Sequence, residues 1–414
     1  MTDIRPLAEA ARRAARVLAT MDPERKAAAL LSMADALEAG ADAVLEANRE
    51  DLDRAAADGA PAAVIDRLTL DGERVTEVAG GIREVAALPD PVGRVLEEQT
   101  RPDGLRIRKV SVPLGVIGVI YEGRPNVTAD AAALAVRSGN AVLLRGSRTA
   151  ERSNAAIVGI LREAGEAAGL PRDAIQQVPP TRETARAMMR ARGLLDLLIP
   201  RGGNDLIQTV VEESTVPVVE TGIGNCHVYV DERADLEKAL EILVNAKVQR
   251  PGVCNAAESF LVHRGVAEAF LPKAVAALQE HGVTVYGDQD VRRHGDGVEP
   301  AGDEEFGAEF LDLRISGAVV DSLDDAIAHI DRFGTKHTEA IVTEDTAAAR
   351  RFVEEIDAAA VMVNASTRFT DGYELGMGAE IGISTQKLHA RGPMALPELT
   401  TAKWVVEGDG HVRR

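Results

Sequence analysis

An alternation of apolar runs and helix-like segments from residue 116 onward constrains the fold of this chain more than any other feature. Residues 116–120 form a continuous apolar run, which is typical of a strand buried in a parallel sheet. Segments with helical spacing of apolar residues separate this run from the next ones. The sequence therefore predicts a doubly wound α/β domain, in which helices cover a parallel sheet. Its predicted strands are 116–120, 141–145, 175–178, 195–199 and 216–220.

A second alternating unit is predicted from residue 227 onward. Residues 288–310 interrupt it with an acidic, Gly-rich stretch that predicts an exposed loop. The two α/β domains are expected to meet near residues 221–254. The predicted strands of the second unit are 227–230, 259–263, 283–286, 315–320, 340–342 and 360–363.

Two segments depart from this alternation. Residues 5–90 carry apolar stripes at helical spacing, and Asp22 followed by Pro23 is a typical helix start. Residues 94–111 change to a strand pattern interrupted by a Pro-Asp-Gly turn, which predicts a β-hairpin. Its strands are rich in charges, so we expect a projecting arm rather than a core element.

Composition excludes several classes of protein. The formal net charge of −19 and the pI of about 5.0 argue against a broad nucleic-acid-binding surface. We expect no membrane span, because no run of about 18 uncharged apolar residues occurs. The chain has two cysteines and its first residues lack an apolar signal core, so a cytoplasmic location is expected. None of the eight histidines has metal-ligand spacing with a cysteine, and no metal site is predicted.

Cys254 is the strongest candidate for chemistry. It follows Pro251 and Gly252 in a break between two apolar runs, where a thiol on a turn would be exposed. A thiolate is the strongest side-chain nucleophile near neutral pH. A lone cysteine is more often a small buried hydrophobe, so the residue alone leaves both interpretations open. Cys226 leads into the apolar run from Val228 and is interpreted as structural.

Glycine motifs give a weaker signal. A Gly-x-Gly-x-x-Gly fingerprint after a strand is missing, as is a P-loop. Gly202 and Gly203 follow the predicted strand 195–199 and open a helix, where backbone N–H groups can hold a phosphate. A plain Gly-containing turn explains this segment equally well.

Several segments together resemble the aldehyde dehydrogenase superfamily, which binds a nicotinamide cofactor on an α/β domain without the usual glycine fingerprint. The similar segments are 113–120, 138–145, 220–224 and 249–254. Within that superfamily, segments 121–128, 199–203 and 389–394 resemble the gamma-glutamyl phosphate reductase family. The resemblance covers nearly the full chain.

The resemblance implies an α/β fold with a Rossmann-type cofactor domain, a second α/β catalytic domain and a β oligomerisation arm. The corresponding ranges are 1–93 and 111–222 for the cofactor domain, 223–395 for the catalytic domain, and 94–110 and 396–414 for the arm. The implied activity is NADPH-dependent reduction of L-glutamate 5-phosphate to L-glutamate 5-semialdehyde and phosphate, in proline biosynthesis. A homo-oligomer is also implied, as is possible functional coupling to glutamate 5-kinase.

The resemblance further assigns catalytic roles. Cys254 becomes the nucleophile that forms a thioester, and Asn126 stabilises the oxyanion together with the Cys254 backbone N–H. Asn126 is otherwise explained as a turn or N-cap residue after Pro125. Glu220 matches the family's general base, yet a carboxylate that caps backbone amides at a strand end fits the same position.

Cofactor and substrate residues follow from the same segments. Arg148 falls where NAD-preferring relatives often carry Glu, and an arginine there can pair with a 2′-phosphate, which predicts NADP(H) preference. Solvated surface charges are the alternative. Glu309 matches the nicotinamide-ribose carboxylate in register better than Glu305 does. The expected cofactor residues are Arg145, Ser147, Arg148, Gly202, Gly203 and Glu309, and the expected substrate residues are Arg124, Arg201 and Arg391.

Two other functions stay open at this point. A hydrolytic aldehyde dehydrogenase would oxidise a small free aldehyde, and the arginines of the family segments argue against it. A non-catalytic protein on an enzyme fold would be expected to have a damaged site, whereas Cys254, Asn126 and Glu220 are all present.

Overall fold

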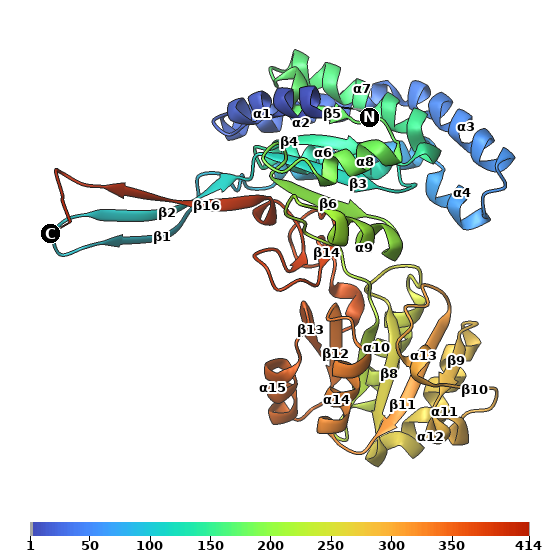
Figure 1. The fold of residues 1–414 in the computed structure, drawn as a ribbon. Coiled ribbons are helices and arrows are strands. Elements are labelled where there is room, and N and C mark those ends of the chain that lie inside the picture. Colours follow the sequence, from blue (N-terminus) through green and yellow to red (C-terminus); the bar gives the residue numbers. More distant parts are fainter. Residues whose placement is uncertain (1–2, 414) are drawn as a thin grey trace. The chain divides into compact units, whose positions relative to one another are not determined.

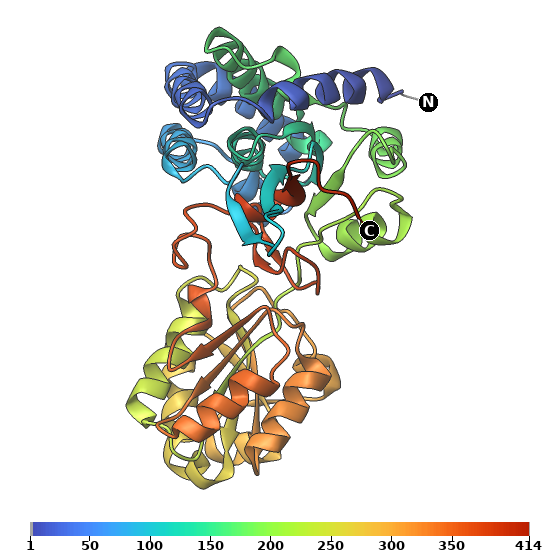
Figure 2. The same ribbon diagram turned by 90° about the vertical axis from the view of Figure 1, so that its left-hand side faces the viewer.

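The structure is a computed structural model that describes residues 3–413, and it contains two compact units (Figures 1 and 2). The first unit runs to Thr221 and also includes Gly376–Gly382 and the chain from Met394 onward. The second unit consists of Gly222–Leu375 and Ile383–Pro393. Residues 376–382, which the sequence analysis assigned to the second domain, thus belong to the first unit.

The first unit is built on a four-stranded parallel sheet in the order β5-β4-β3-β6. The central strand β3 is buried along its whole length, as its apolar sequence predicts. The predicted strand at 216–220 is wrong, because only Val218 bridges to Leu198 there. Pro217 has no N–H to donate to a ladder, which explains why pairing stops. The strands are β3 (Val116–Tyr121), β4 (Ala141–Arg145), β5 (Ile175–Gln177) and β6 (Leu197–Arg201).

Nine α-helices complete the first unit among the described residues. Helix α6 (Asn126–Arg137) is almost entirely buried, since alanine, valine and leucine surround its axis. A helix packed on all sides holds its first residue, Asn126, on a rigid support. The other helices are α1 (Arg5–Leu18), α2 (Pro23–Ala39), α3 (Ala41–Ala57), α4 (Ala62–Leu68), α5 (Gly72–Ala87), α7 (Glu151–Ala167), α8 (Arg182–Met189) and α9 (Asn204–Glu213).

The predicted hairpin forms and acquires a third strand. Strands β1 (Val95–Thr100) and β2 (Arg106–Pro113) pair antiparallel, and β16 (Thr400–Glu407) pairs with the other edge of β2. Figure 1 shows this ribbon projecting away from the rest of the first unit. Every residue of β1 is exposed, which agrees with its charged sequence.

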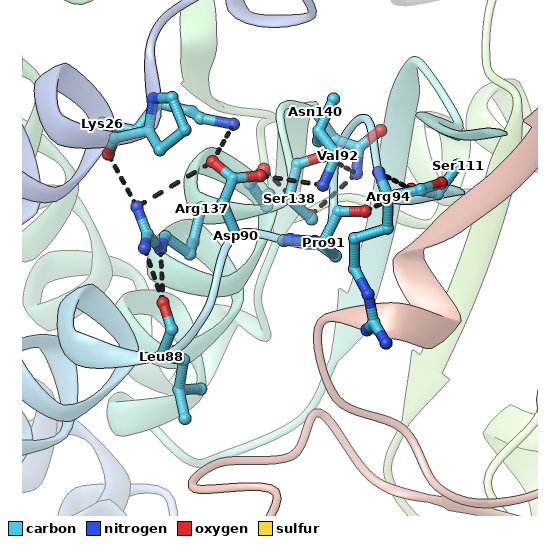
Figure 3. Close-up of polar contacts among 12 residues, drawn as sticks. Lys26, Leu88, Asp90, Pro91, Val92, Arg94, Ser111, Arg137, Ser138 and Asn140 are labelled. Atoms are coloured by element: carbon cyan, nitrogen blue, oxygen red, sulfur yellow. Dashed lines mark hydrogen bonds and ion pairs between the residues drawn. The ribbon is translucent and has the colours of Figure 1, made fainter. Parts of the chain in front are cut away.

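A buried polar network fixes the root of this ribbon (Figure 3). Lys26 lies 2.6 Å from the Asp90 carboxylate, and both side chains are buried. Arg137, at the end of α6, donates to the carbonyl of Leu88 at 2.5 Å from Nη2. Asn140 donates from Nδ2 to the carbonyl of Leu399, just before β16. Buried polar groups of this kind are stable only when paired, so the network fixes where the ribbon leaves the sheet.

The second unit has a seven-stranded parallel sheet in the order β10-β9-β11-β8-β7-β12-β13. Alternate residues of one strand face opposite layers: Val228 and Val230 belong to one apolar core and Tyr229 to the other. The strands are β7 (Cys226–Val230), β8 (Ala257–His263), β9 (Thr284–Gly287), β10 (Glu299–Pro300), β11 (Arg314–Val320), β12 (Thr338–Val342) and β13 (Ala360–Val363).

Helices cover both faces of this sheet. One core includes residues of α10 and α11, and the other includes residues of α14 and α15. The expected exposed loop at 288–310 is wrong in part, because α12, β10 and α13 form there. Val291 anchors the segment in the core, which composition alone does not reveal. The helices are α10 (Leu236–Val248), α11 (Arg264–Glu280), α12 (Gln289–His294), α13 (Asp303–Phe306), α14 (Leu323–Phe333) and α15 (Thr346–Glu355).

A short pair, β14 (Ile383–Ser384) and β15 (Gly392–Pro393), completes the second unit. Within residues 3–413 no helix is long and apolar enough to cross a membrane. In the same range, no group of three or more His, Cys, Asp or Glu side chains is arranged to hold a metal ion.

Candidate active site

Cys254 lies in the turn between α10 and β8, where its side chain is partly exposed, as the sequence predicts. Cys226 is fully buried on β7, and burial together with nearby carboxylates raises the pKa of its thiol well above the usual value. Its Sγ donates to the Cys254 carbonyl at 3.2 Å. Asn255 fixes the other side of the turn, because its Nδ2 donates to the Thr370 carbonyl at 2.8 Å. The accessible thiol thus stands on a firmly held backbone.

Glu309 is connected to the Cys254 turn by a hydrogen bond to Gly224. The Gly224 N–H donates to Glu309 Oε1 at 2.6 Å. A Cβ on Gly224 would lie 1.5 Å from the Cys254 carbonyl oxygen, so only glycine fits between the two segments. Glu305 instead accepts from the Gly302 N–H within α13. This arrangement favours Glu309 over Glu305 as the carboxylate beside Cys254.

Arg368 is a candidate site residue that the sequence analysis missed. Its Nε donates to Gln249 Oε1 at 2.8 Å, which places the guanidinium beside the segment that leads to Cys254. Burial lowers the pKa of Arg368, whereas the negative charge of Asp371 and of an ionised Cys254 opposes that change. A nearby cation stabilises a thiolate. No local sequence pattern indicates this role, because Arg368 and Cys254 come together only through the fold.

Asn126 occupies the first position of α6 and is exposed. Its Nδ2 donates to Asp130 Oδ2 at 3.2 Å, one turn along the helix. Burial raises the pKa of Asp130 to about 6, and the positive charge of Arg201 partly offsets this rise. The contact from Nδ2 to Asp130 fixes which end of the Asn126 amide faces this carboxyl group. The fold brings Asn126 close to Arg201, one of the expected substrate residues.

Gly202 and Gly203 do not form a vacant phosphate cradle. Glu122 Oε2 accepts from the Gly203 N–H at 2.9 Å, at the start of α9. A Cβ on Gly202 would lie 2.4 Å from the same oxygen, so a larger residue there would require the Glu122 side chain to shift. A phosphate here would have to displace a carboxylate that the helix N-terminus already favours.

The other expected cofactor residues lie after β4. Ser147 accepts from the Gly123 N–H at 3.2 Å, joining the turns that follow β3 and β4. Arg145 is half-buried and its Nη2 donates to the Thr181 carbonyl at 3.0 Å, whereas the Arg148 side chain is exposed. Ligands of open α/β sheets bind beyond the carboxyl ends of the strands, which is where these residues lie.

A pocket of about 420 Å³ opens at this edge, beyond the end of β5. It contains two guanidinium groups, Arg54 and Arg152, that the sequence analysis did not select. Arg54 donates to the Arg148 carbonyl at 2.7 Å, so it also holds the backbone of that turn. Arg54 also pairs with Asp51 at 2.5 Å and Arg152 with Glu50 at 3.6 Å, so both guanidinium groups already have a carboxylate partner. The remaining lining residues are Glu151, Ala155, Gln177, Pro179 and Pro180.

The remaining expected residues are distributed over both units. Arg124 is exposed and Glu220 is half-buried, and both belong to the first unit. Arg391 belongs to the second unit, where its Nη2 lies 2.8 Å from Asp357. Lys387, Arg391 and Lys336 hold the pKa of Asp357 well below its usual range. Arg391 is therefore already neutralised in part by a neighbouring carboxylate.

Comparisons with known proteins show the family of this chain. The model of the aldehyde dehydrogenase family matches residues 1–292. The gamma-glutamyl phosphate reductase of Thermobifida fusca is 58% identical over 99% of both chains, and that of Carboxydothermus hydrogenoformans is 54% identical over the full length of both. The chain belongs to the gamma-glutamyl phosphate reductase family.

A solved structure extends the agreement to the fold. The gamma-glutamyl phosphate reductase of Thermotoga maritima has a TM-score of 0.98, 48% sequence identity and complete coverage of both chains. The predicted aldehyde dehydrogenase-like α/β fold is thereby confirmed. As a member of the gamma-glutamyl phosphate reductase family, the protein is an oxidoreductase of the aldehyde dehydrogenase type, and this type uses NAD(P) cofactors.

Proposed function

We propose that this protein reduces L-glutamate 5-phosphate to L-glutamate 5-semialdehyde with NADPH, releasing phosphate, in proline biosynthesis. The supporting observation is the partly exposed thiol of Cys254 on a turn fixed by Gly224, Cys226 and Asn255. A nucleophile must be accessible and oriented before it can attack an acyl carbon. Membership of the gamma-glutamyl phosphate reductase family supplies the substrate in this proposal.

The first chemical step belongs to Cys254. Its thiolate attacks the acyl carbon, a C–S bond forms, and the C–O bond to phosphate breaks with the electron pair leaving on phosphate. Arg368 favours the thiolate form of Cys254 through its positive charge. Asn126 Nδ2 and the Cys254 N–H are proposed to donate to the oxyanion that develops on the carbonyl oxygen.

A reduced nicotinamide, when bound, would supply a hydride to the thioester carbon. The C–S bond then breaks, the aldehyde leaves and the Cys254 thiolate is restored. Glu309 is proposed to hold its ribose, and the residues after β4 and β5 to hold its adenosine end. Arg54, Arg148 and Arg152 provide guanidinium groups there, which can pair with a 2′-phosphate bidentately. Arg54 and Arg152 already have carboxylate partners, so the exposed Arg148 carries the proposed preference for NADPH over NADH.

Substrate anions are proposed to meet Arg124 and Arg201 first. Arg201 lies close enough to Asp130 to lower its pKa, and Asp130 accepts from Asn126, so this guanidinium is near the proposed oxyanion donor. Arg391 shares Asp357 with two lysines and is proposed as a weaker contributor.

The test follows nucleotide reduction in the reverse direction, from glutamate 5-semialdehyde. We expect the reaction to require phosphate, because the thioester is resolved by phosphate rather than by water. We also expect kcat/KM to be at least about 10-fold higher with NADP⁺ than with NAD⁺, because NAD⁺ lacks the 2′-phosphate and so loses one charge-assisted contact. Activity that persists without phosphate would support a hydrolytic dehydrogenase, with Glu220 as the base that activates water. Equal use of the two nucleotides would overturn the cofactor proposal alone.

The ribbon β1-β2-β16 is proposed to join copies of this chain. Strand β16 pairs on one side only within the described residues, and Trp404 and Val406 are 57% and 56% exposed on it. An open strand edge with apolar side chains favours pairing with a second copy. We expect sedimentation at micromolar concentration to give a dimer or larger species, and the double change W404E/V406E to shift it toward monomer. A wild-type chain that sediments as a monomer would contradict this.

A further inference from the structure

A fully buried ion pair lies on either side of Cys254 in the sequence. Lys247 is the second-last residue of α10 and Glu258 is the second residue of β8, and the exposed fraction of each side chain is 0%. Their Nζ and Oε2 atoms are 2.5 Å apart. Removing two charges from water is unfavourable, and apolar residues of similar size often stabilise a fold equally well. The pair therefore requires an explanation beyond stability.

The second carboxylate oxygen of Glu258 supplies that explanation. Glu258 Oε1 accepts from the Leu311 N–H at 3.0 Å. Leu311 has φ of 52°, a left-handed conformation that is unfavourable for a leucine. Such a conformation persists only where surrounding contacts impose it. Lys247 holds Glu258 in place, and Glu258 imposes the backbone of Leu311.

The backbone of Leu311 lies next to the two parts of the candidate site in the second unit, the Glu309 carboxylate and the Cys254 turn. Glu309, two residues before Leu311, accepts from the Gly224 N–H, and Gly224 abuts the Cys254 carbonyl. On the other side, a Cβ on Gly252 would lie 3.8 Å from the Leu311 carbonyl oxygen. The segment 309–311 thus lies next to Gly252, two residues before Cys254, and is hydrogen-bonded to Gly224, two residues before the start of β7.

We propose that Lys247 and Glu258 are positioning residues, which fix the segment 309–311 against the Cys254 turn through the Leu311 N–H. Neither touches the reacting atoms. Their effect is to keep the Glu309 carboxylate and the Cys254 thiol at a fixed separation, so that cofactor and acyl group meet correctly. This proposal rests on the proposed function, because it assigns Glu309 to the cofactor ribose.

Two double variants separate the anchor from the buried charges. K247M/E258Q removes both charges but keeps a side-chain oxygen that can accept from Leu311. K247M/E258M removes both charges and this acceptor as well. Neither variant leaves an unpaired buried charge, so we expect both to fold, as thermal unfolding will check.

The expected result is a difference between the two variants. Binding of NADPH alone, measured by calorimetry, should weaken by about 10-fold or more in K247M/E258M and by less than about 3-fold in K247M/E258Q. The rate at which iodoacetamide alkylates Cys254 should likewise change more in K247M/E258M than in K247M/E258Q. Equal binding and equal alkylation in two folded variants would overturn the proposal. A wild-type enzyme that shows no phosphate-dependent activity would instead overturn the proposed function.

Hydrogen exchange in the wild-type protein tests the same anchor without any substitution. Leu311 is 40% exposed, yet its N–H is held by a buried carboxylate. We expect this amide to exchange at least about 100-fold more slowly than in an unstructured peptide. Exchange at the peptide rate would show that Glu258 does not hold Leu311, and would overturn the proposal even if both double variants fail to fold.

Discussion

Replacement of Cys254 by alanine is expected to lower kcat for glutamyl-phosphate reduction by at least about 10⁴-fold, the scale of losing a covalent nucleophile. Alanine leaves the turn intact, because Gly224, Cys226 and Asn255 hold its backbone rather than its side chain. The protein should therefore stay folded and bind NADPH as the wild type does. The assay is NADPH consumption with glutamyl phosphate, together with calorimetric NADPH binding.

Cys226→Ala is the matched control, because it removes the only other thiol of the chain. The Cys226 thiol is fully buried and its pKa is raised by burial, so it cannot supply a thiolate near neutral pH. We expect this variant to keep most of its activity, with a modest loss from the missing contact to the Cys254 carbonyl. An active Cys254→Ala protein beside an inactive Cys226→Ala protein would refute the assignment of the nucleophile.

Replacement of Asn126 by alanine should lower kcat by about 10²–10³-fold, because one oxyanion donor contributes about 3 kcal/mol to the transition state. The KM for the substrate should change little, since the charge on the oxygen develops only during reaction. Helix α6 should remain folded, because Asn126 is exposed and its side chain caps no backbone N–H. Single-turnover kinetics separate this loss from an effect on product release.

Asn204→Ala provides the comparison for Asn126. Asn204 is also an exposed asparagine at the first position of a helix in the same unit, α9. We expect its replacement to leave kcat within about 3-fold of wild type, as surface substitutions usually have small effects. Near-wild-type turnover of a folded Asn126→Ala protein would mean that Asn126 is only a helix-start residue.

The candidate site was accessible from sequence where a single local segment carries it. The turn around Cys254 follows from Pro251 and Gly252, whereas Asn126 and Arg145 were selected through segments that resemble the family. In the structure Asn126 begins α6 and Arg145 ends β4. Arg368, Arg54 and Glu122 were missed for one shared reason. Each acts through a partner far along the chain, and no local pattern encodes such a pair.

The sequence by itself determined the two parallel sheets, the charged hairpin and the turn that carries Cys254, because apolar periodicity and turn residues are local properties. Only the tertiary structure decided that residues 288–310 form α12, β10 and α13. It also decided that Glu122 accepts from the Gly203 N–H and that Glu258 accepts from the Leu311 N–H. These outcomes depend on burial and on hydrogen bonds between distant segments. Such contacts form only after the helices and strands have packed.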